Sequence, residues 1–136
     1  MNLHCPARML LVRDDAAGVL TDEPMRVARV YCAPEAAAQR TAAGLAVRTG
    51  AGVEVVAELA DLPRDDSAES PAPRQDVVRR FDAAVGAIAD LHRGETVVVV
   101  AGAGLLAAVL GREPAAGETV QIDHDGTGWA VARGPA

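Results

Sequence analysis

Short apolar runs of strand length alternate with helix-forming segments along most of the chain, and this alternation constrains the fold more than any other feature. The run Thr96–Val100 consists entirely of β-branched residues, which is typical of a strand buried on both faces. Further runs rich in Val and Leu predict strands over 8–13, 27–31 and 53–59. Strands that alternate with helices favour a parallel sheet covered on both faces. The sequence therefore predicts an α/β fold with three layers, α/β/α, around a mostly parallel central sheet.

Two longer helices and one short helix are predicted between these strands. An Ala-rich segment covers Pro34–Thr49, with Gly50 as its stop. A later helix repeats apolar residues at three- and four-residue steps, at Val77, Phe81, Ala84, Val85, Ile88 and Leu91. The short helix is expected over 103–110, and a closing hairpin over 120–132.

A chain of 136 residues fits one domain. Half of the residues are apolar, but Tyr31, Phe81 and Trp129 are the only aromatic ones, so Ala, Val and Leu must fill the core. The segment 62–73 is polar and contains three prolines, and we expect it to form an exposed loop.

The charge pattern excludes several classes of partner. A net charge of −6 without a basic stripe argues against nucleic acid. No apolar run has the length of a membrane span, and the N-terminus lacks the basic-then-apolar order of a signal peptide. Cys5 and Cys32 lack CxxC spacing, which favours reduced thiols in a cytoplasm. All basic residues are Arg, a bias that predicts a GC-rich bacterial source.

In open α/β sheets, ligands bind beyond the carboxyl ends of the strands. Three short segments follow predicted strands in this way: residues 13–15, 32–34 and 101–104. A functional site is therefore expected where these three segments meet.

Taken in order, these segments resemble the histidine phosphatase superfamily, which includes the cofactor-dependent phosphoglycerate mutases. The family's first strand ends Leu-Val-Arg-His-Gly, and residues 11–15 read Leu-Val-Arg-Asp-Asp. Its second strand runs into Ser-Pro-Leu-x-Arg-Ala-x-Gln-Thr-Ala, where residues 33–42 read Ala-Pro-Glu-Ala-Ala-Ala-Gln-Arg-Thr-Ala. Its later motif, His-x-Gly-Glu-Thr-Val leading to Val-Ser-His-Gly-Gly, corresponds to residues 92–104. The resemblance covers about residues 8–110 and implies a single truncated domain of this kind over 1–136.

The departures from the family pattern fall on residues that carry its chemistry. The resemblance places the nucleophilic histidine at Asp14 and the second pocket histidine at Gly102. Of the two pocket arginines, Arg13 is kept and the other becomes Ala37, with Arg40 three residues later as the nearest substitute. Phosphoryl transfer to an enzyme needs a nucleophile and several cations around the developing charge. We therefore expect no phosphohistidine chemistry.

Asp14 and Asp15 add an electrostatic argument. A carboxylate at about 4 Å repels a phosphate by roughly 1–4 kcal/mol per unit charge. The two residues are interpreted as a turn that favours Asp, with a catalytic carboxylate pair as the alternative. Arg13 is interpreted as half of a salt bridge to one of them, and otherwise as an anion-binding relic. A metal here would need Glu58 or Asp61 as further ligands, and none is predicted.

Two other features at the predicted strand ends have a functional and a structural interpretation. Residues 102–107 match the G-x-G-x-x-G/A pattern of dinucleotide-binding loops. Too little chain follows for such a fold, so Gly102 and Gly104 are interpreted as the helix start bordering a ligand cleft, and no cofactor is predicted. Cys32 occupies a strand end where a thiol nucleophile works, but no histidine is placed to activate it. A small buried residue is the preferred interpretation of Cys32.

Two functions remain open. The first is a catalytically degenerate member of the superfamily that binds, regulates or assembles with a protein partner, with homodimerisation expected to support so small a core. The second is an enzyme of bacterial secondary-metabolite biosynthesis acting on a small-molecule ligand. In it, Asp14 or Asp15 is the general base and Arg13 orients a carboxylate or enolate. Residual phosphate-ester binding ranks last.

Overall fold

The computed structural model describes residues 6–14, 26–60, 72–115, 118–125 and 127–131. They form one six-stranded sheet in the order β3-β2-β4-β1-β5-β6. The strands are β1 (Ala7–Arg13), β2 (Arg29–Cys32), β3 (Gly52–Val55), β4 (Thr96–Ala101), β5 (Thr119–His124) and β6 (Trp129–Val131). The first four strands of the chain are parallel to one another, and β5 and β6 extend the sheet antiparallel beyond β1. The mostly parallel sheet predicted from the sequence is confirmed.

Strand β4 lies at the centre of the parallel part. Val98 is opposite Leu10 of β1 on one side and Val30 of β2 on the other. The whole stretch Val97–Val100 is fully buried, so the β-branched run is covered on both faces of the sheet. This arrangement is what the uninterrupted apolar character of the run predicts.

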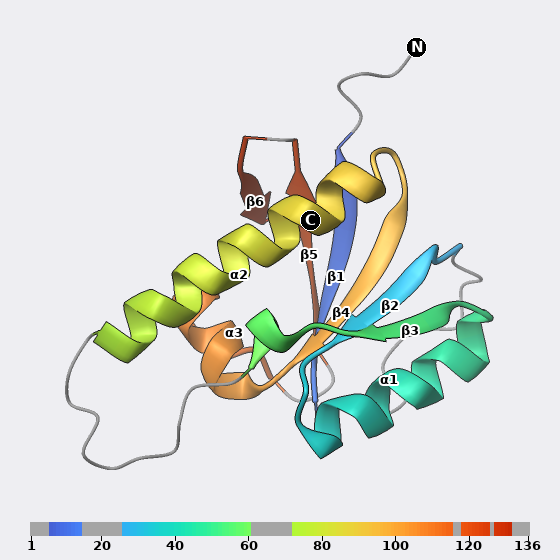
Figure 1. Cartoon of the computed structure of the whole chain (residues 1–136), viewed down its shortest axis with the longest axis horizontal. Coiled ribbons are helices and arrows are strands. Elements are labelled where there is room, and N and C mark those ends of the chain that lie inside the picture. The colour runs from blue at the N-terminus through green and yellow to red at the C-terminus, as the bar shows by residue number, and fades with distance from the viewer. Residues whose placement is uncertain (1–5, 15–25, 61–71, 116–117, 126, 132–136) are drawn as a thin grey trace.

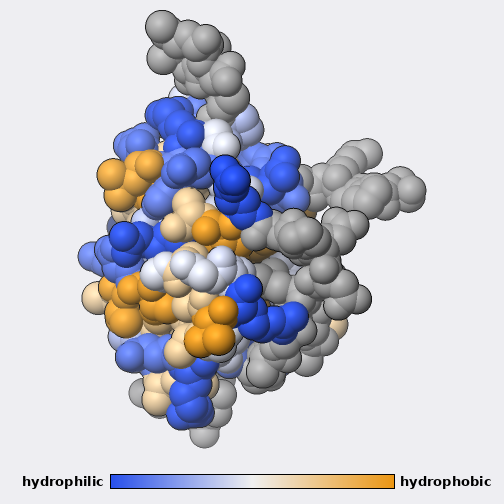
Figure 2. All heavy atoms as spheres, turned by 90° about the vertical axis from the view of Figure 1, so that its right-hand side faces the viewer, coloured by the Kyte–Doolittle hydropathy of each residue, from blue (hydrophilic) through white to orange (hydrophobic). Residues whose placement is uncertain are grey.

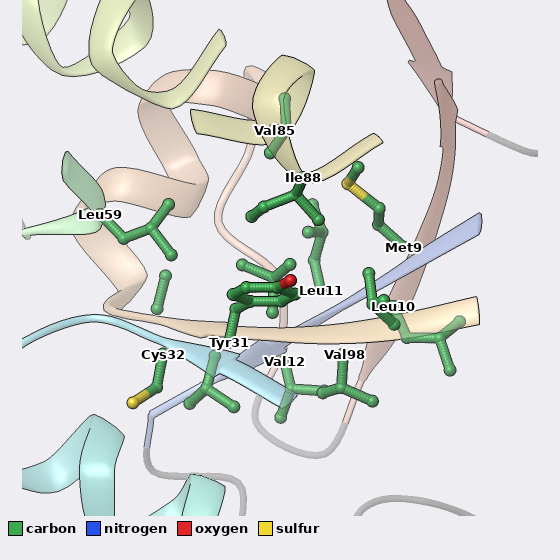
Figure 3. Close-up of a cluster of buried hydrophobic side chains, with 14 of the residues drawn as sticks. Met9, Leu10, Leu11, Val12, Tyr31, Cys32, Leu59, Val85, Ile88 and Val98 are labelled. Carbon is green, nitrogen blue, oxygen red and sulfur yellow. The ribbon is translucent and has the colours of Figure 1, made fainter. Parts of the chain in front are cut away.

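Helices cover both faces of the sheet, as Figure 1 shows. Helix α1 (Ala36–Thr49) lies on one face, and α2 (Ala72–Leu91) and α3 (Ala103–Leu110) lie on the other. Figure 3 shows the resulting alternation in β2, where Tyr31 points toward the α2 side and Cys32 toward the α1 side. The three-layer α/β/α architecture is therefore confirmed.

Glycines end two of the three helices. Gly50 caps α1 with φ 77°, and Gly111 caps α3 with φ 78°. A residue with a Cβ is strained in this left-handed conformation, so Gly is the residue of choice at both positions. The predicted stop at Gly50 is confirmed, and so are the bounds of the short helix at 103–110.

Some element boundaries differ from the prediction. The strand expected over 53–59 ends at Val55, and a short 3₁₀ turn, η1 (Ala57–Leu59), follows. Leu59 is fully buried against the core while β3 itself is exposed, so the chain leaves the sheet edge to bury this side chain. The first helix begins at Ala36, two residues after Pro34.

The Pro-rich loop expected over 62–73 falls for the most part outside the described residues. Helix α2 starts at Ala72, so Ala72 and Pro73 belong to its first turn. The first turn of a helix tolerates proline, because its N–H would have no partner there.

The apolar stripe of α2 faces the sheet over five of its six predicted positions. The buried members are Val77, Phe81, Ala84, Val85 and Ile88. The prediction was wrong for Leu91, which is the last residue of the helix and is 74% exposed. The buried stripe therefore ends about one turn before the helix does.

The C-terminal hairpin is attached to the same helix through its tryptophan. Trp129 Nε1 donates a hydrogen bond of 2.8 Å to Asp82 Oδ1. The Trp129 ring also meets Phe81 edge to face, with ring centroids 5.8 Å apart. Two adjacent residues of α2 thus hold β6 against the helical layer, one by a polar contact and one by an aromatic contact.

The surface of the described part is mixed in polarity. Figure 2 shows hydrophobic residues in small groups separated by hydrophilic ones on the side it presents. Among the described residues, no helix combines the length and the apolar character needed to cross a membrane.

Replacing Phe81 with alanine should destabilise the protein strongly. The side chain is fully buried, so Phe81→Ala should lower the free energy of unfolding by about 3–5 kcal/mol. Leu91→Ala on the same helix is the matched control and should cost less than about 1 kcal/mol, because Leu91 is 74% exposed. Urea denaturation followed by circular dichroism measures both variants. Equal losses in the two variants would contradict the packing described here.

Candidate functional site

The parallel strands bring their carboxyl ends to one edge of the sheet. Arg13 at the end of β1 lies opposite Ala101 at the end of β4. The backbone N–H of Asp14 donates to the Ala101 carbonyl at 2.9 Å, and that of Ala33 donates to the Val100 carbonyl at 2.9 Å. The three segments singled out from the sequence therefore meet, as far as they are described. We call this region, residues 13–14, 32–34 and 101–104, the carboxyl edge.

Arg13 is engaged at this edge by residues that the sequence did not indicate. Its Nη1 donates to the Pro114 carbonyl at 2.8 Å and lies 3.7 Å from Glu113 Oε2. The Arg13 side chain is only 16% exposed, whereas that of Glu113 is 64% exposed. Arg13 thus has an ion pair with Glu113, a partner that was not predicted, and the predicted pair with Asp14 or Asp15 stays a prediction. Asp15, one of the two partners expected, lies outside the described residues.

The partnership with Glu113 follows from the direction of β5. Because β5 runs antiparallel to β1, Thr119 at its start lies opposite Val12 at the end of β1. The connection 111–118 from α3 to β5 must therefore reach the carboxyl edge. Sequence reasoning placed β5 in a closing hairpin without pairing it to β1. Had β5 been predicted to pair antiparallel with β1, the connection that precedes it would have been expected near Arg13.

The backbone of Asp14 is held at two atoms. Its N–H is bonded to Ala101 as described, and its carbonyl accepts a hydrogen bond of 2.6 Å from Thr41 Oγ1 of α1. Thr41 is buried, so this contact is partly shielded from water. Asp14 is thereby fixed between the central strand and the first helix.

Arg40 lies on the solvent-exposed face of α1. The residues of α1 that face the sheet include Ala38 and Thr41, which are buried. At 100° per residue, Arg40 is about 200° around the helix from Ala38 and about 100° from Thr41. Arg40 is accordingly exposed, and Ala37 lies at the border between the two faces. The helix therefore gives no support to Arg40 as a replacement for the arginine expected at Ala37.

Cys32 has the environment of a structural thiol. It is fully buried, and its side chain points toward α1 (Figure 3). Burial raises the pKa of the Cys32 thiol, because the charged thiolate loses hydration. A raised pKa lowers the fraction of reactive thiolate. The structure thus supports the interpretation of Cys32 as a small buried residue.

Gly102 and Gly104 form the junction of β4 and α3. Gly102 is buried and is the N-cap of α3, with φ −72° and ψ 158°. Its carbonyl accepts a hydrogen bond of 3.1 Å from the Leu106 N–H, and Gly104 is the second residue of the helix. The predicted helix start is confirmed. The φ of Gly102 is one that any residue adopts, so the backbone conformation does not require glycine there.

The described histidines lie at the opposite edge of the sheet. His124 is paired with Ala7 at the start of β1, and His92 precedes the start of β4. The length of β1 separates that edge from Arg13 by about 20 Å. Tyr31 Oη lies 2.7 Å from His92 Nε2, and Glu95 Oε1 lies 2.8 Å from Nδ1. Both ring nitrogens of His92 are therefore engaged far from the carboxyl edge.

Only some of the residues considered as metal ligands are described. Glu58 lies in η1 and is exposed, while Asp61 is outside the described ranges. Within those ranges, no three side chains of His, Cys, Asp or Glu are grouped so that they could hold a metal ion.

An ion pair between Arg112 and Glu118, which we call the charged clamp, lies on either side of Glu113 and Pro114 in the sequence. Glu118 accepts hydrogen bonds from Arg112 at 2.6 and 3.0 Å and from the Ala115 N–H at 3.0 Å. These contacts, that of Arg112 first, lower the pKa of the Glu118 carboxyl to about 2 from an ordinary value of 4.5. The clamp holds the short turn whose carbonyl at Pro114 engages Arg13.

Removing the clamp should change the pH dependence of stability. Because the Glu118 pKa is lowered in the folded state, its contribution is present above about pH 4.5 and is lost as the pH falls toward about 2. Glu118→Gln should therefore be less stable than the parent at pH 7, and the difference should shrink below about pH 4.5 and vanish only below about pH 2. Thermal denaturation at a series of pH values measures this. The same substitution made in an Arg112→Gln background should have a smaller effect, and an unchanged effect would contradict the pairing.

No protein-family model matches the sequence, and no curated protein matches it either. Solved structures do. Bacillus stearothermophilus YhfR superposes with a TM-score of 0.77 at 17% identity, over 93% of this chain and 95% of that one. A mycobacterial glucosyl-3-phosphoglycerate phosphatase complexed with VO3 gives a TM-score of 0.68 at 16% identity, over 95% and 99%. A phosphoglycerate mutase from Plasmodium falciparum gives 0.60 at 12%, over 95% and 90%.

These similarities extend over nearly the whole of each chain, so they concern the entire architecture rather than one shared motif. The layers and the central parallel strands are those expected from the resemblance found in the sequence. This chain has the fold of the histidine phosphatase and phosphoglycerate mutase superfamily.

Proposed function

We propose that this protein carries out no phosphohistidine chemistry and acts as a binding or assembly module for a protein partner on a histidine phosphatase fold. The observation that carries the proposal is the engagement of Arg13. Its guanidinium donates to the Pro114 carbonyl and faces the Glu113 carboxylate. With Nη1 engaged and the side chain only 16% exposed, this guanidinium has few donors left for an incoming phosphate.

Electrostatics at the carboxyl edge support the same conclusion. Asp14 follows Arg13 directly, and Glu113 lies 3.7 Å from the guanidinium. Each of these carboxylates opposes a phosphate dianion, by roughly 1–4 kcal/mol per unit charge at about 4 Å. Phosphoryl transfer requires the opposite arrangement, with several cations around the developing charge.

The positions of the histidines give independent support. Both described imidazoles are at the far edge of the sheet, and His92 is occupied by Tyr31 and Glu95. The positions that the resemblance assigns to the reactive histidines hold Asp14 and Gly102. Nothing described at the carboxyl edge supplies an imidazole nucleophile.

The purified protein should neither hydrolyse p-nitrophenyl phosphate nor bind orthovanadate. Its rate of hydrolysis should equal that of buffer, and vanadate should leave the melting temperature unchanged, because Arg13 is engaged and flanked by acids. An absorbance assay and a thermal-shift titration measure the two outcomes. The variant Asp14→Ala is the control for contamination, because hydrolysis by a contaminating phosphatase would persist in a preparation of this variant. Hydrolysis that disappears in Asp14→Ala would refute the proposal.

The second candidate is an enzyme of small-molecule biosynthesis with Asp14 as general base. The observation that favours it is the rigid placement of Asp14 by Ala101 and Thr41, since catalytic groups need fixed positions. In this case Asp14→Asn should abolish the cellular function without changing the melting temperature by more than about 2 °C. Under the binding proposal the same variant keeps its cellular function. Complementation of a deletion strain separates the two.

A further inference from the structure

A cavity on the α2 face of the sheet has no role in the chemistry discussed so far. Its volume is about 260 Å³, and it lies between the last turns of α2 and the strands β2 and β3. The helix contributes an apolar wall made of Ala83, Ala84, Ala87, Ile88 and Leu91. Figure 3 shows Ile88 and Tyr31 on the same side of the sheet, where they border this space. Leu91, which was predicted to belong to the buried stripe of α2 but is exposed, is part of that wall.

The opposite side of the cavity is acidic. Glu54 of β3 and Glu58 of η1 line it, together with the small apolar side chain of Val56. Glu54 lies 3.4 Å from Arg29, an exposed ion pair that neutralises only part of its charge. Among the described residues, no hydrogen bond or ion pair engages Glu58. The rim therefore carries net negative charge.

The floor of the cavity is rigid and polar at one point. Tyr31 is nearly fully buried, and its hydroxyl is bonded to His92, which Glu95 holds in turn. The Glu95 carboxylate accepts a hydrogen bond, so Nδ1–H of His92 is the donor, and in the neutral ring Nε2 then accepts a hydrogen bond from the Tyr31 hydroxyl. Burial, and next the nearby charge of Glu54, raise the pKa of Tyr31 above its ordinary value.

We propose that this cavity binds a small amphipathic organic cation, namely an ammonium ion on an apolar body. The apolar body lies against Ala87, Ile88 and Leu91, and the ammonium group pairs with Glu58 and Glu54. Apolar walls with a few convergent polar groups are the usual make-up of small-molecule sites. The volume is just below the range for drug-sized ligands, so the occupant is small. The cavity shares no residue with the carboxyl edge, and the proposal does not rest on the proposed function.

The only tyrosine of the chain provides a direct test. Protein labelled with 3-fluorotyrosine has a single ¹⁹F resonance, at the floor of the cavity. Titration with 2-phenylethylammonium should shift this resonance saturably. The neutral 2-phenylethanol should bind about two- to fivefold more weakly, the range for one exposed ion pair. The anionic 3-phenylpropanoate should produce no saturable shift.

Substitutions at the rim should move the affinity in opposite directions. Glu58→Gln removes an acceptor of the ammonium charge and should weaken binding about two- to fivefold. Arg29→Gln removes the competitor for Glu54 and should strengthen binding of the same cation. Neither residue is buried, so both variants should fold.

Filling the cavity gives the decisive variant. Ala87 is exposed at the wall of the cavity, and Ala87→Trp should abolish the saturable shift. Ala43→Trp on the exposed face of α1 is the matched control and should bind like the parent. The proposal is overturned by any of three results: no saturable shift with the ammonium probe, equal binding of the carboxylate probe, or unchanged affinity in Ala87→Trp. Failure here leaves the vanadate and hydrolysis outcomes untouched, so the two proposals fail separately.

Discussion

The pairing of β4 with both β1 and β2 is the constraint on which the rest of the structure depends. Four consecutive valines, Val97–Val100, are fully buried between a helix layer on each side, and each contributes about 1.5–3 kcal/mol by burial. A central strand of this kind fixes the register of its neighbours, because a slip by one residue would turn their core side chains to the other face. The carboxyl ends of the three strands are thereby brought to a common edge.

The fold of this chain and the contacts at its carboxyl edge depend on different residues. The fold needs the buried strands, the helix layers and the glycine caps, and these are present. The chemistry of phosphate needs cations and imidazole at the carboxyl edge, where this chain has an arginine engaged by Glu113 and an aspartate fixed by Thr41. Packing and reactivity thus depend on different residues, and one can change while the other persists.

Much of the fold could be predicted from the sequence, because the burial of a strand or helix face determines the spacing of its apolar residues. The valines of β4, the stripe of α2 and the cap at Gly50 each follow from a local rule. The rules failed where tertiary contacts determine the end of an element. One case is Leu59, which was predicted in the strand but lies beyond the end of β3 and is buried in the core. They failed again at Leu91, because the periodicity of a helix does not show how far along it the sheet continues to cover its apolar face.

The candidate site was predictable in position but not in its contacts. The strand ends predicted which segments would meet, because parallel strands share an edge, and that these segments form a functional site stays a prediction. The partner of Arg13 was missed because it comes from a segment 100 residues later, as the hydrogen bond to Pro114 spans 101 positions. The chain from Tyr31 through His92 to Glu95 was missed for the same reason, since Tyr31 and His92 are 61 positions apart.

The bond from Arg13 to the Pro114 carbonyl has an evolutionary consequence. A side-chain partner can be removed by one codon change, whereas a main-chain oxygen persists whatever residue occupies the position. Replacing Asp14 with histidine or neutralising Glu113 would therefore leave the guanidinium bonded to the main chain at Pro114, beside the Arg112–Glu118 pair. Releasing Arg13 from this contact requires a change in the backbone at Pro114, which a single side-chain substitution at either of those positions does not provide.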